Sequence, residues 1–269
     1  DPGRFTAFAA HEYSPPLDAH GKLHRNVFFR NQKTSKRAYS AFDAATAPIL
    51  WKILEEDCFG ECDFLTIPQN LNRTWDLAYA MQTIDGDPYS EEDWRRRARY
   101  EPLAEIIQGK GSSECAVGVG TAYEEFHFEQ FLPLYDVGES RGWITATSMV
   151  RDGLKRGLEL QQTLGQNPFR LGFVGSTDTH NSNPGDTEEY DYRGVVGLRE
   201  SPAVVKMDPE PRSRWPIHLT PGGLTGVWAD ENTHDVLFDS LQQREAYAIS
   251  GTRIRLQFFA GHGYTDDML

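Results

Sequence analysis

Short apolar and β-branched runs alternate along the chain with longer amphipathic stretches. The runs typical of strands are Phe5–Ala9, Val27–Arg30, Phe64–Ile67, Leu103–Ile107, Leu171–Val174, Gly226–Trp228 and Arg253–Phe259. Strands that are separated by helical stretches indicate βα units rather than a β-sandwich. The pattern therefore predicts an α/β fold.

The amphipathic stretches predict the helices. These are expected at Ala44–Glu56, Glu91–Tyr100, Ala122–Phe131, Thr145–Leu164 and Thr233–Arg244. In the fourth, apolar residues recur at helical spacing, and the Gly165-Gln-Asn-Pro sequence that follows is a stop signal. Asn232 or Thr233 is placed to cap the last helix.

The length of the chain, 269 residues of which 39% are hydrophobic, is enough to bury a sizeable core. We expect a single domain that covers residues 1–269. Within it, the polar and proline-rich segments Asp186–Arg193 and Lys206–Pro221 are expected to be long loops. No internal repeat is visible, which argues against a solenoid.

The charge balance is acidic. The 40 Asp and Glu residues outnumber the 27 Lys and Arg residues, and the net charge of -13 argues against nucleic acid as a surface-bound partner. A small anion in a metal-lined pocket is compatible with this charge, because a bound divalent ion reverses the local field. No apolar run approaches the roughly 18 residues that a membrane-spanning helix needs, so no membrane partner is expected.

The cysteines Cys58, Cys62 and Cys115 are too few for a disulfide framework. The spacing of Cys58 and Cys62 lacks the second pair that would complete a zinc site. Buried or free thiols are the first interpretation, and a bridge between Cys62 and Cys115 is the alternative.

Asp178 and His180 follow the apolar run Leu171–Val174, where a buried strand would end. In barrels of βα units the C-terminal strand ends form the active face, and residues i and i+2 of an extended segment project to the same side. A carboxylate and an imidazole in this arrangement are suited to a hard or borderline cation. The simpler interpretation of the pair alone is a turn-forming Asp and a surface His.

A second candidate pair lies near the N-terminus. Glu12 follows a short apolar strand, and His24 stands just before the strand Val27–Arg30. Each residue alone is also explained by a surface role. With Asp178 and His180 they make a set of carboxylates and imidazoles at the ends of the expected strands.

Polar residues follow further strands in the segments "CDFLTIPQNLN" and "EPLAEIIQGKGSSEC". Gln69 and Asn70 follow the first strand, while Glu105, Gln108 and Lys110 lie at the end of the second. Lys110 is suited to neutralise an oxygen of a phosphate or sulfate group. The alternative for Lys110 is a loop lysine that faces solvent.

The motifs resemble the DUF3604 family, whose members are similar to the PHP superfamily of metal-dependent phosphoesterases. The matching segments, in order, are "HEYS…LHRNVFFRN", "CDFLTIPQNLN", "EPLAEIIQGKGSSEC", "NPFRLGFVGSTDTHNSNPG", "GGLTGVWADENT" and "REAYAISGTRI". The resemblance extends from about Phe5 to Phe259. It implies a distorted (β/α)7 TIM-like barrel with about two or three divalent ions, zinc, manganese or iron, at the C-terminal ends of its strands.

The resemblance also implies roles for the candidate residues. Glu12 matches a carboxylate that often bridges metals, and His24 matches a histidine ligand. Asp178 and His180 match the final Asp-x-His ligands of the family.

Lys110 and Arg25 lie in motifs typical of the family, and we interpret them as anion binders. With Asp178 they form the expected catalytic set.

The chain departs from the family pattern in two ways. The first metal motif of the superfamily is a His-x-His near the start of the barrel, and none of the eight histidines here forms one. We therefore expect a barrel that is incomplete at its N-terminus, whose first strand and ligands come from an N-terminal segment absent from this chain, come from another polypeptide, or do not exist. Gln69 stands where related sequences carry the His of "IPHN", and a glutamine oxygen is a poorer zinc ligand.

The expected function is hydrolysis of phosphate mono- or diesters, in which a metal-activated hydroxide attacks phosphorus and Lys110 stabilises the developing charge. His127, in "YEEFHFEQF", is a candidate proton donor to the leaving group. The alternatives are a non-catalytic binding or scaffold domain without a complete metal centre, and a hydrolase of sulfate or organophosphate esters. The resemblance favours a periplasmic or secreted bacterial protein.

Overall fold

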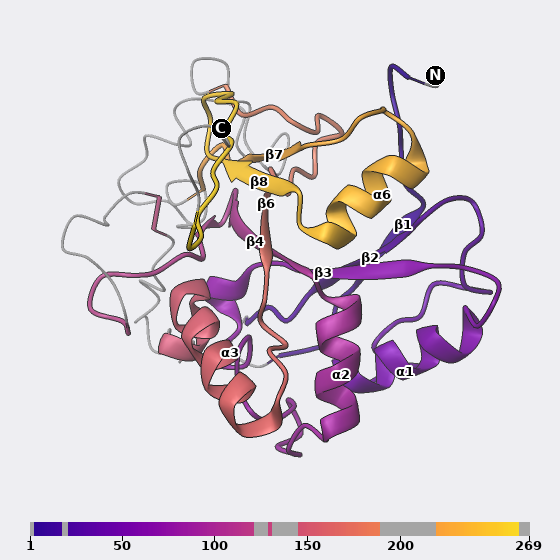
Figure 1. The fold of residues 1–269 in the computed structure, drawn as a ribbon, viewed down its shortest axis with the longest axis vertical. Helices are drawn as coiled ribbons and strands as arrows, with labels where there is room; N and C mark the ends of the chain where they lie inside the picture. Colours follow the sequence, from indigo (N-terminus) through magenta and orange to yellow (C-terminus); the bar gives the residue numbers. More distant parts are fainter. Residues whose placement is uncertain (1–2, 18–20, 121–128, 131–144, 189–218, 264–269) are drawn as a thin grey trace.

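Small sheets with helices packed against them make up the fold (Figure 1). The structure is a computed structural model, and it describes residues 3–17, 21–120, 129–130, 145–188 and 219–263. The strands are β1 (Ala10–Tyr13), β2 (Arg25–Phe29), β3 (Phe64–Pro68), β4 (Leu103–Gln108), β5 (Gly111–Ser112), β6 (Gly172–Gly175), β7 (Leu224–Val227) and β8 (Ala246–Ile249). The helices are α1 (Ala47–Asp57), α2 (Glu91–Tyr100), α3 (Val150–Leu164) and α6 (His234–Gln243), with short 3-10 turns η1 (Leu71–Arg73) and η2 (Ala146–Ser148).

The expected (β/α)7 barrel is wrong for the described residues, because their strands form separate sheets that do not close. The sheet orders are β1-β2-β3, β5-β4-β6 and β7-β8. A barrel of this kind needs parallel neighbours throughout. Here only β4 and β6 pair in parallel, while β2 pairs antiparallel with both β1 and β3. The connection from β1 to β2 contains no helix in its described residues, and a parallel pair requires a crossover connection.

Most expected elements between residues 25 and 243 are confirmed within a few residues. Helix α2 has the expected bounds, because Ser90 and Asp93 form a capping box at its N-terminus. The expected helix Thr145–Leu164 is divided into η2 and α3. The expected helix Ala122–Phe131 lies outside the described residues except for 129–130, which are not helical.

The terminal strands were predicted less well. The first strand begins at Ala10 rather than at Phe5, because its pairing with β2 starts at Ala10 opposite Phe28. The segment Arg253–Phe259 is not a strand, and β8, which pairs with β7, was missed. An apolar run forms a strand only where a neighbouring strand is available to pair with it, and the sequence of the run does not show this.

Strand β3 forms the centre of the core and is buried at every residue. Its side chains alternate between two layers of helices, as Figure 1 shows for α1 and α2 on one side and α6 on the other. Toward α1, the indole Nε1 of Trp51 donates to Thr66 Oγ1 at 3.1 Å. Toward α6, Leu65 packs in a cluster with Phe238. This double burial explains why β3 is apolar on both faces except for Thr66, whose hydroxyl is hydrogen-bonded.

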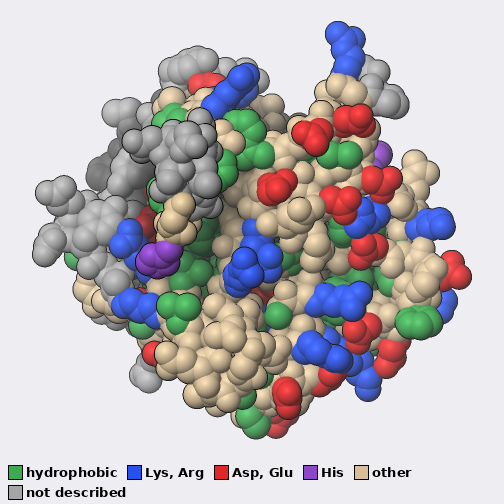
Figure 2. Space-filling model, in the orientation of Figure 1, with side chains coloured by type: hydrophobic (Ala, Val, Ile, Leu, Met, Phe, Trp, Pro, Cys, Tyr) green, Lys and Arg blue, Asp and Glu red, His purple; other side chains and the backbone are tan. Residues whose placement is uncertain are grey.

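Acidic and basic side chains are interspersed over α6, α1 and α2 on the face drawn in Figure 2. Arg30, for example, pairs with Asp63 and Asp239. Acidic side chains on this face therefore have basic neighbours with which to pair. Of the helices that the structure describes, none is both long and apolar enough to span a bilayer.

Both interpretations of the cysteines need correction. Cys58 and Cys62 form a disulfide bond at the C-terminal end of α1, and Cys115 is a buried free thiol. The bridge between Cys62 and Cys115 is therefore wrong, and so are free thiols at positions 58 and 62. The spacing of four residues fits one turn at a helix end, where α1 stops and Cys58 caps it.

Replacing Cys58 and Cys62 together with alanine is expected to lower the free energy of unfolding by about 2 kcal/mol, because the bridge closes only a short loop of the unfolded chain. Urea denaturation measures this change. Reducing agent should destabilise the wild-type protein by a similar amount and leave the double variant unchanged. Equal sensitivity of both proteins to reducing agent would contradict the assignment of the bridge.

Candidate functional site

Three residues of the predicted site meet at one end of the β1-β2-β3 sheet. Glu12 lies on β1, His24 directly precedes β2, and Gln69 directly follows β3. His24 Nδ1 lies 2.9 Å from Glu12 Oε1, and Gln69 Nε2 donates to Glu12 Oε2 at 3.3 Å. The antiparallel register places Glu12 opposite Asn26, and the backbone bond from Gln69 N to His24 O, 3.1 Å, holds the third strand in place.

Glu12 remains ionised at neutral pH in this position. Hydrogen bonding to His24 lowers its pKa to about 2, although partial burial opposes the shift. Ser14 and Gln69 also donate to this carboxylate. A carboxylate that keeps its charge is available as a ligand for a cation, but it is a poor general base.

Lys110 is placed by the hairpin turn between β4 and β5. Its ammonium group pairs with Asp178 Oδ2, and only 7% of the residue is exposed. Burial lowers the pKa of Lys110 to about 8, while Glu105 acts in the opposite direction. The turn thus places the buried ammonium group of Lys110 beside the loop that follows β6.

The loop after β6 carries Asp178 and His180. Asp178 has a φ of 50°, so the chain leaves the extended conformation there, and His180 Nε2 still lies 3.4 Å from Asp178 Oδ1. The loop packs closely on Gly222, where a side-chain carbon would lie 2.5 Å from the Ser176 carbonyl oxygen and 2.8 Å from Gly109 N. Gly222 therefore permits the close contact that brings the Asp178 loop beside the Lys110 turn.

A chain of amide side chains connects the two groups. Gln108 Nε2 donates to Gln69 Oε1 at 3.4 Å, and Asn70 Nδ2 donates to the same oxygen at 3.3 Å. At the other end, Lys110 N donates to Gln108 Oε1 at 3.0 Å. The pair of Glu12 and His24 and the pair of Asp178 and Lys110 therefore belong to one hydrogen-bonded network. We call it the polar network.

Glu105 supports this network from below. Its carboxyl group accepts from Asn70 N at 3.1 Å and from the Ser176 hydroxyl. Burial raises the pKa of Glu105, and these donors counteract the shift. Glu105 therefore ties the loop after β3 to the loop after β6.

Arg25, an expected anion binder, points away from the network. Side chains alternate along β2, so His24 and Asn26 face Glu12 and Gln69 whereas Arg25 faces the core. Its Nε donates to Glu101 Oε2 at 2.7 Å, and its guanidinium group lies 5.6 Å from the centre of the Trp51 ring. We therefore correct the interpretation of Arg25 to a structural one. His127, the candidate proton donor, lies outside the described residues.

Two cations near the network were missed from the sequence. Lys22 N donates to Arg73 O at 2.7 Å, and the pKa of Lys22 is lowered by burial and by the charge of Arg73. Lys22 lies two residues before His24, so extended spacing would have placed both on one side. Arg73 lies a few residues after β3, at the end of the turn η1. Its contact with Lys22 depends on this turn, which the sequence pattern did not predict.

The donor groups fit a divalent ion in chemical kind. Glu12 with His24, and Asp178 with His180, each offer a carboxylate and an imidazole, and the buried Asn70 Oδ1 accepts no hydrogen bond from the described residues. No three His, Cys, Asp or Glu side chains gather as a metal-ligand group in the described ranges, so each pair supplies two such ligands. Gln69 turns its amide nitrogen rather than its oxygen toward Glu12, and the amide must turn over for Gln69 to act as a ligand.

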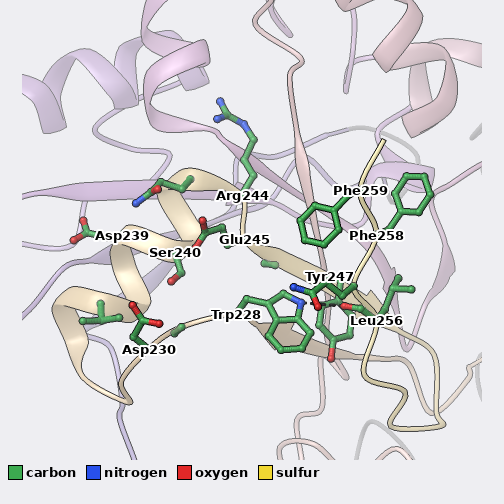
Figure 3. Close-up of a pocket in the computed structure, with 15 residues that line it drawn as sticks. Trp228, Asp230, Asp239, Ser240, Arg244, Glu245, Tyr247, Leu256, Phe258 and Phe259 are labelled. Carbon is green, nitrogen blue, oxygen red and sulfur yellow. Dashed lines mark hydrogen bonds between the residues drawn. The ribbon is translucent and has the colours of Figure 1, made fainter. Parts of the chain in front are cut away.

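A separate cavity of about 740 Å³ lies beside β7, β8 and α6. Figure 3 shows the rings of Trp228, Tyr247, Phe258 and Phe259 around it, with Arg244 at its edge. None of the predicted site residues lines this cavity. The candidate site is therefore defined by the polar network and not by this second cavity.

Residues 1–269 match the family described as "Protein of unknown function (DUF3604)". No curated protein and no solved structure shows a significant match to the chain.

Proposed function

The chain belongs to the DUF3604 family, and from this premise we propose that it hydrolyses phosphate esters with the aid of a divalent metal ion. The observation that carries the proposal is the polar network, which gathers Glu12, His24, Lys110 and Asp178 from distant parts of the chain. The resemblance to PHP phosphoesterases that we infer from the sequence motifs is consistent with the proposal.

We propose two separate pairs of metal ligands, Glu12 with His24 and Asp178 with His180, with Gln69 as a further ligand beside Glu12 if its amide turns over. An ion bound by such a pair would supply Lewis acidity toward phosphoryl oxygens and a water of lowered pKa.

The protein's own groups then position the ester. Lys110 binds a non-bridging oxygen of the phosphoryl group, and its burial strengthens this contact because little water screens it. Asp178 holds the ammonium group of Lys110 and orients the attacking water. The hydrogen bond between the Gln69 and Gln108 amides holds the Glu12 and Lys110 ends of the polar network in fixed positions. The charged groups therefore need not move during the reaction.

Metal content and ester turnover test the proposal together. The purified protein is expected to contain about one divalent ion or more per chain by elemental mass spectrometry. It should also hydrolyse p-nitrophenyl phosphate or bis-p-nitrophenyl phosphate and lose this activity in chelator. The His24→Ala variant should lose metal and turnover.

His234→Ala is the matched control. His234 contacts the Ala7 carbonyl oxygen at the start of α6, away from the network, so this variant should keep both properties. If His24→Ala retained as much metal and activity as His234→Ala, the proposal would fail. A protein that binds phosphate but turns over neither ester would instead favour a non-catalytic binding domain.

A further inference from the structure

Exposed apolar side chains gather in the segment Ile254–Phe259, which follows β8 and which we call the exposed arm. Ile254, Leu256 and Phe258 have 59%, 48% and 79% of their surface exposed. Figure 3 shows Leu256 and Phe258 on one side of the arm and Phe259 on the other. The side chains thus alternate as in a strand, and the even-numbered ones form an apolar row that faces solvent.

The backbone of the exposed arm has no strand beside it in the part of the chain that the structure describes. Ile254 N donates to Thr252 O at 2.8 Å in a local turn, and the Trp228 indole Nε1 donates to Leu256 O at 2.9 Å. The indole bond holds the middle of the arm near the end of β7. Backbone groups without a strand partner, next to an apolar row, are a template on which a further strand can add.

We propose that the exposed arm pairs antiparallel with the exposed arm of a second copy of this chain, about a twofold axis at Leu256. Leu256 then lies opposite Leu256 of the second copy, and Ile254 lies opposite Phe258. The two apolar rows join into one, in which a β-branched and an aromatic side chain form a favourable cross-strand pair. Each arm uses the same surface for the contact, so the assembly closes as a dimer.

Charge favours the antiparallel direction. In this register Arg255 lies opposite Gln257 of the second copy, whereas parallel pairing in register would set arginine beside arginine. Arg255 is on the side of Phe259, so it approaches the cavity of the second copy, which the exposed carboxylates Asp230 and Glu245 line. Of the described residues that line this cavity, only Arg244 is basic. The second copy therefore supplies both apolar and charge complementarity to the exposed arm.

Cysteine cross-linking tests the register. Leu256→Cys should form a disulfide-linked dimer on mild oxidation, because the Cα atoms of opposite residues in an antiparallel pair lie about 4.5–5.5 Å apart, within disulfide reach. Gln257→Cys is the matched control, since position 257 is exposed but lies opposite position 255, out of reach of its own copy. Equal cross-linking of the two variants, or none in Leu256→Cys, overturns the proposal.

Charges placed on the axis test the pairing in solution. Analytical ultracentrifugation at about 100 µM should show a wild-type dimer. Leu256→Lys and Leu256→Glu should each be monomeric, because like charges meet at the axis, and an equimolar mixture of the two should restore the dimer. Phe42→Lys, a control at a fully exposed phenylalanine before α1, should dimerise as the wild type does.

A wild-type protein that is monomeric at this concentration overturns the proposal. So does a dimer that both charge variants retain, because the contact would then lie on another surface. Failure of the mixture to restore the dimer overturns the twofold pairing at Leu256. These measurements are independent of ester turnover and metal content, so their outcome does not depend on the proposed function.

Discussion

Replacing Glu101 with glutamine is expected to lower the free energy of unfolding by roughly 3–5 kcal/mol. Glu101 lies at the C-terminal end of α2 with 1% of its surface exposed, and it pairs with Arg25 at 2.7 Å and Arg97 at 3.0 Å. Both arginines are also buried. The amide would leave two buried guanidinium charges without their shared carboxylate, and breaking a buried ion pair costs far more than breaking an exposed one.

Urea denaturation of Glu101→Gln and of the control Glu56→Gln measures this effect. Glu56 is exposed on α1, so the control should change stability by about 0.5 kcal/mol or less. A loss below about 1 kcal/mol in Glu101→Gln would show that the buried arginines do not depend on this carboxylate. The comparison also tests the structural role of Arg25. If Arg25 bound an anion instead of Glu101, loss of the Glu101 charge would have little effect on the free energy of unfolding.

The second large effect is expected for Asp178→Asn, which should reduce kcat/KM for phosphate ester by about 100- to 1,000-fold. The amide keeps the size of the side chain but removes the charge that pairs with Lys110 and that we propose as a metal ligand. Metal content should fall with activity. The melting temperature reports whether the variant remains folded.

Asp230→Asn is the control for this prediction, because Asp230 is exposed and lines the separate cavity near α6. It should retain wild-type activity and metal content. Full activity of a folded Asp178→Asn protein would remove Asp178 from the mechanism. Loss of activity with unchanged metal content would instead assign Asp178 to the orientation of Lys110 alone.

The sequence predicted local structure where local interactions decide it. Helix α2 has its capping box within four neighbouring residues, and β3 is an apolar run that is buried on both faces. The sequence also placed Glu12, His24 and Lys110 at strand ends, and hydrogen bonds connect them in the structure, although the parallel strand order that the prediction assumed is wrong. The motif order gave the family, which the match over residues 1–269 confirms.

Other features depended on contacts between distant residues. The direction of β2 relative to β1 and β3 is set by pairing across the sheet, and an apolar run has the same pattern in either direction. The partners of Arg25, Glu101 and Trp51, also come from distant segments. The side of β2 to which Arg25 points could instead have been predicted, because alternation places it opposite His24.

The sequence by itself thus determined the family and most of the helices, since each depends on residue types and short spacings. Only the tertiary structure decided that the strands form separate sheets, that Cys58 pairs with Cys62, and that Arg25 pairs with Glu101 in the core. The physical reason is the separation along the chain of the residues that interact. Capping and periodicity involve residues that are a few positions apart. Strand direction and the pairing of buried charges instead depend on which distant segments pack against one another and become buried.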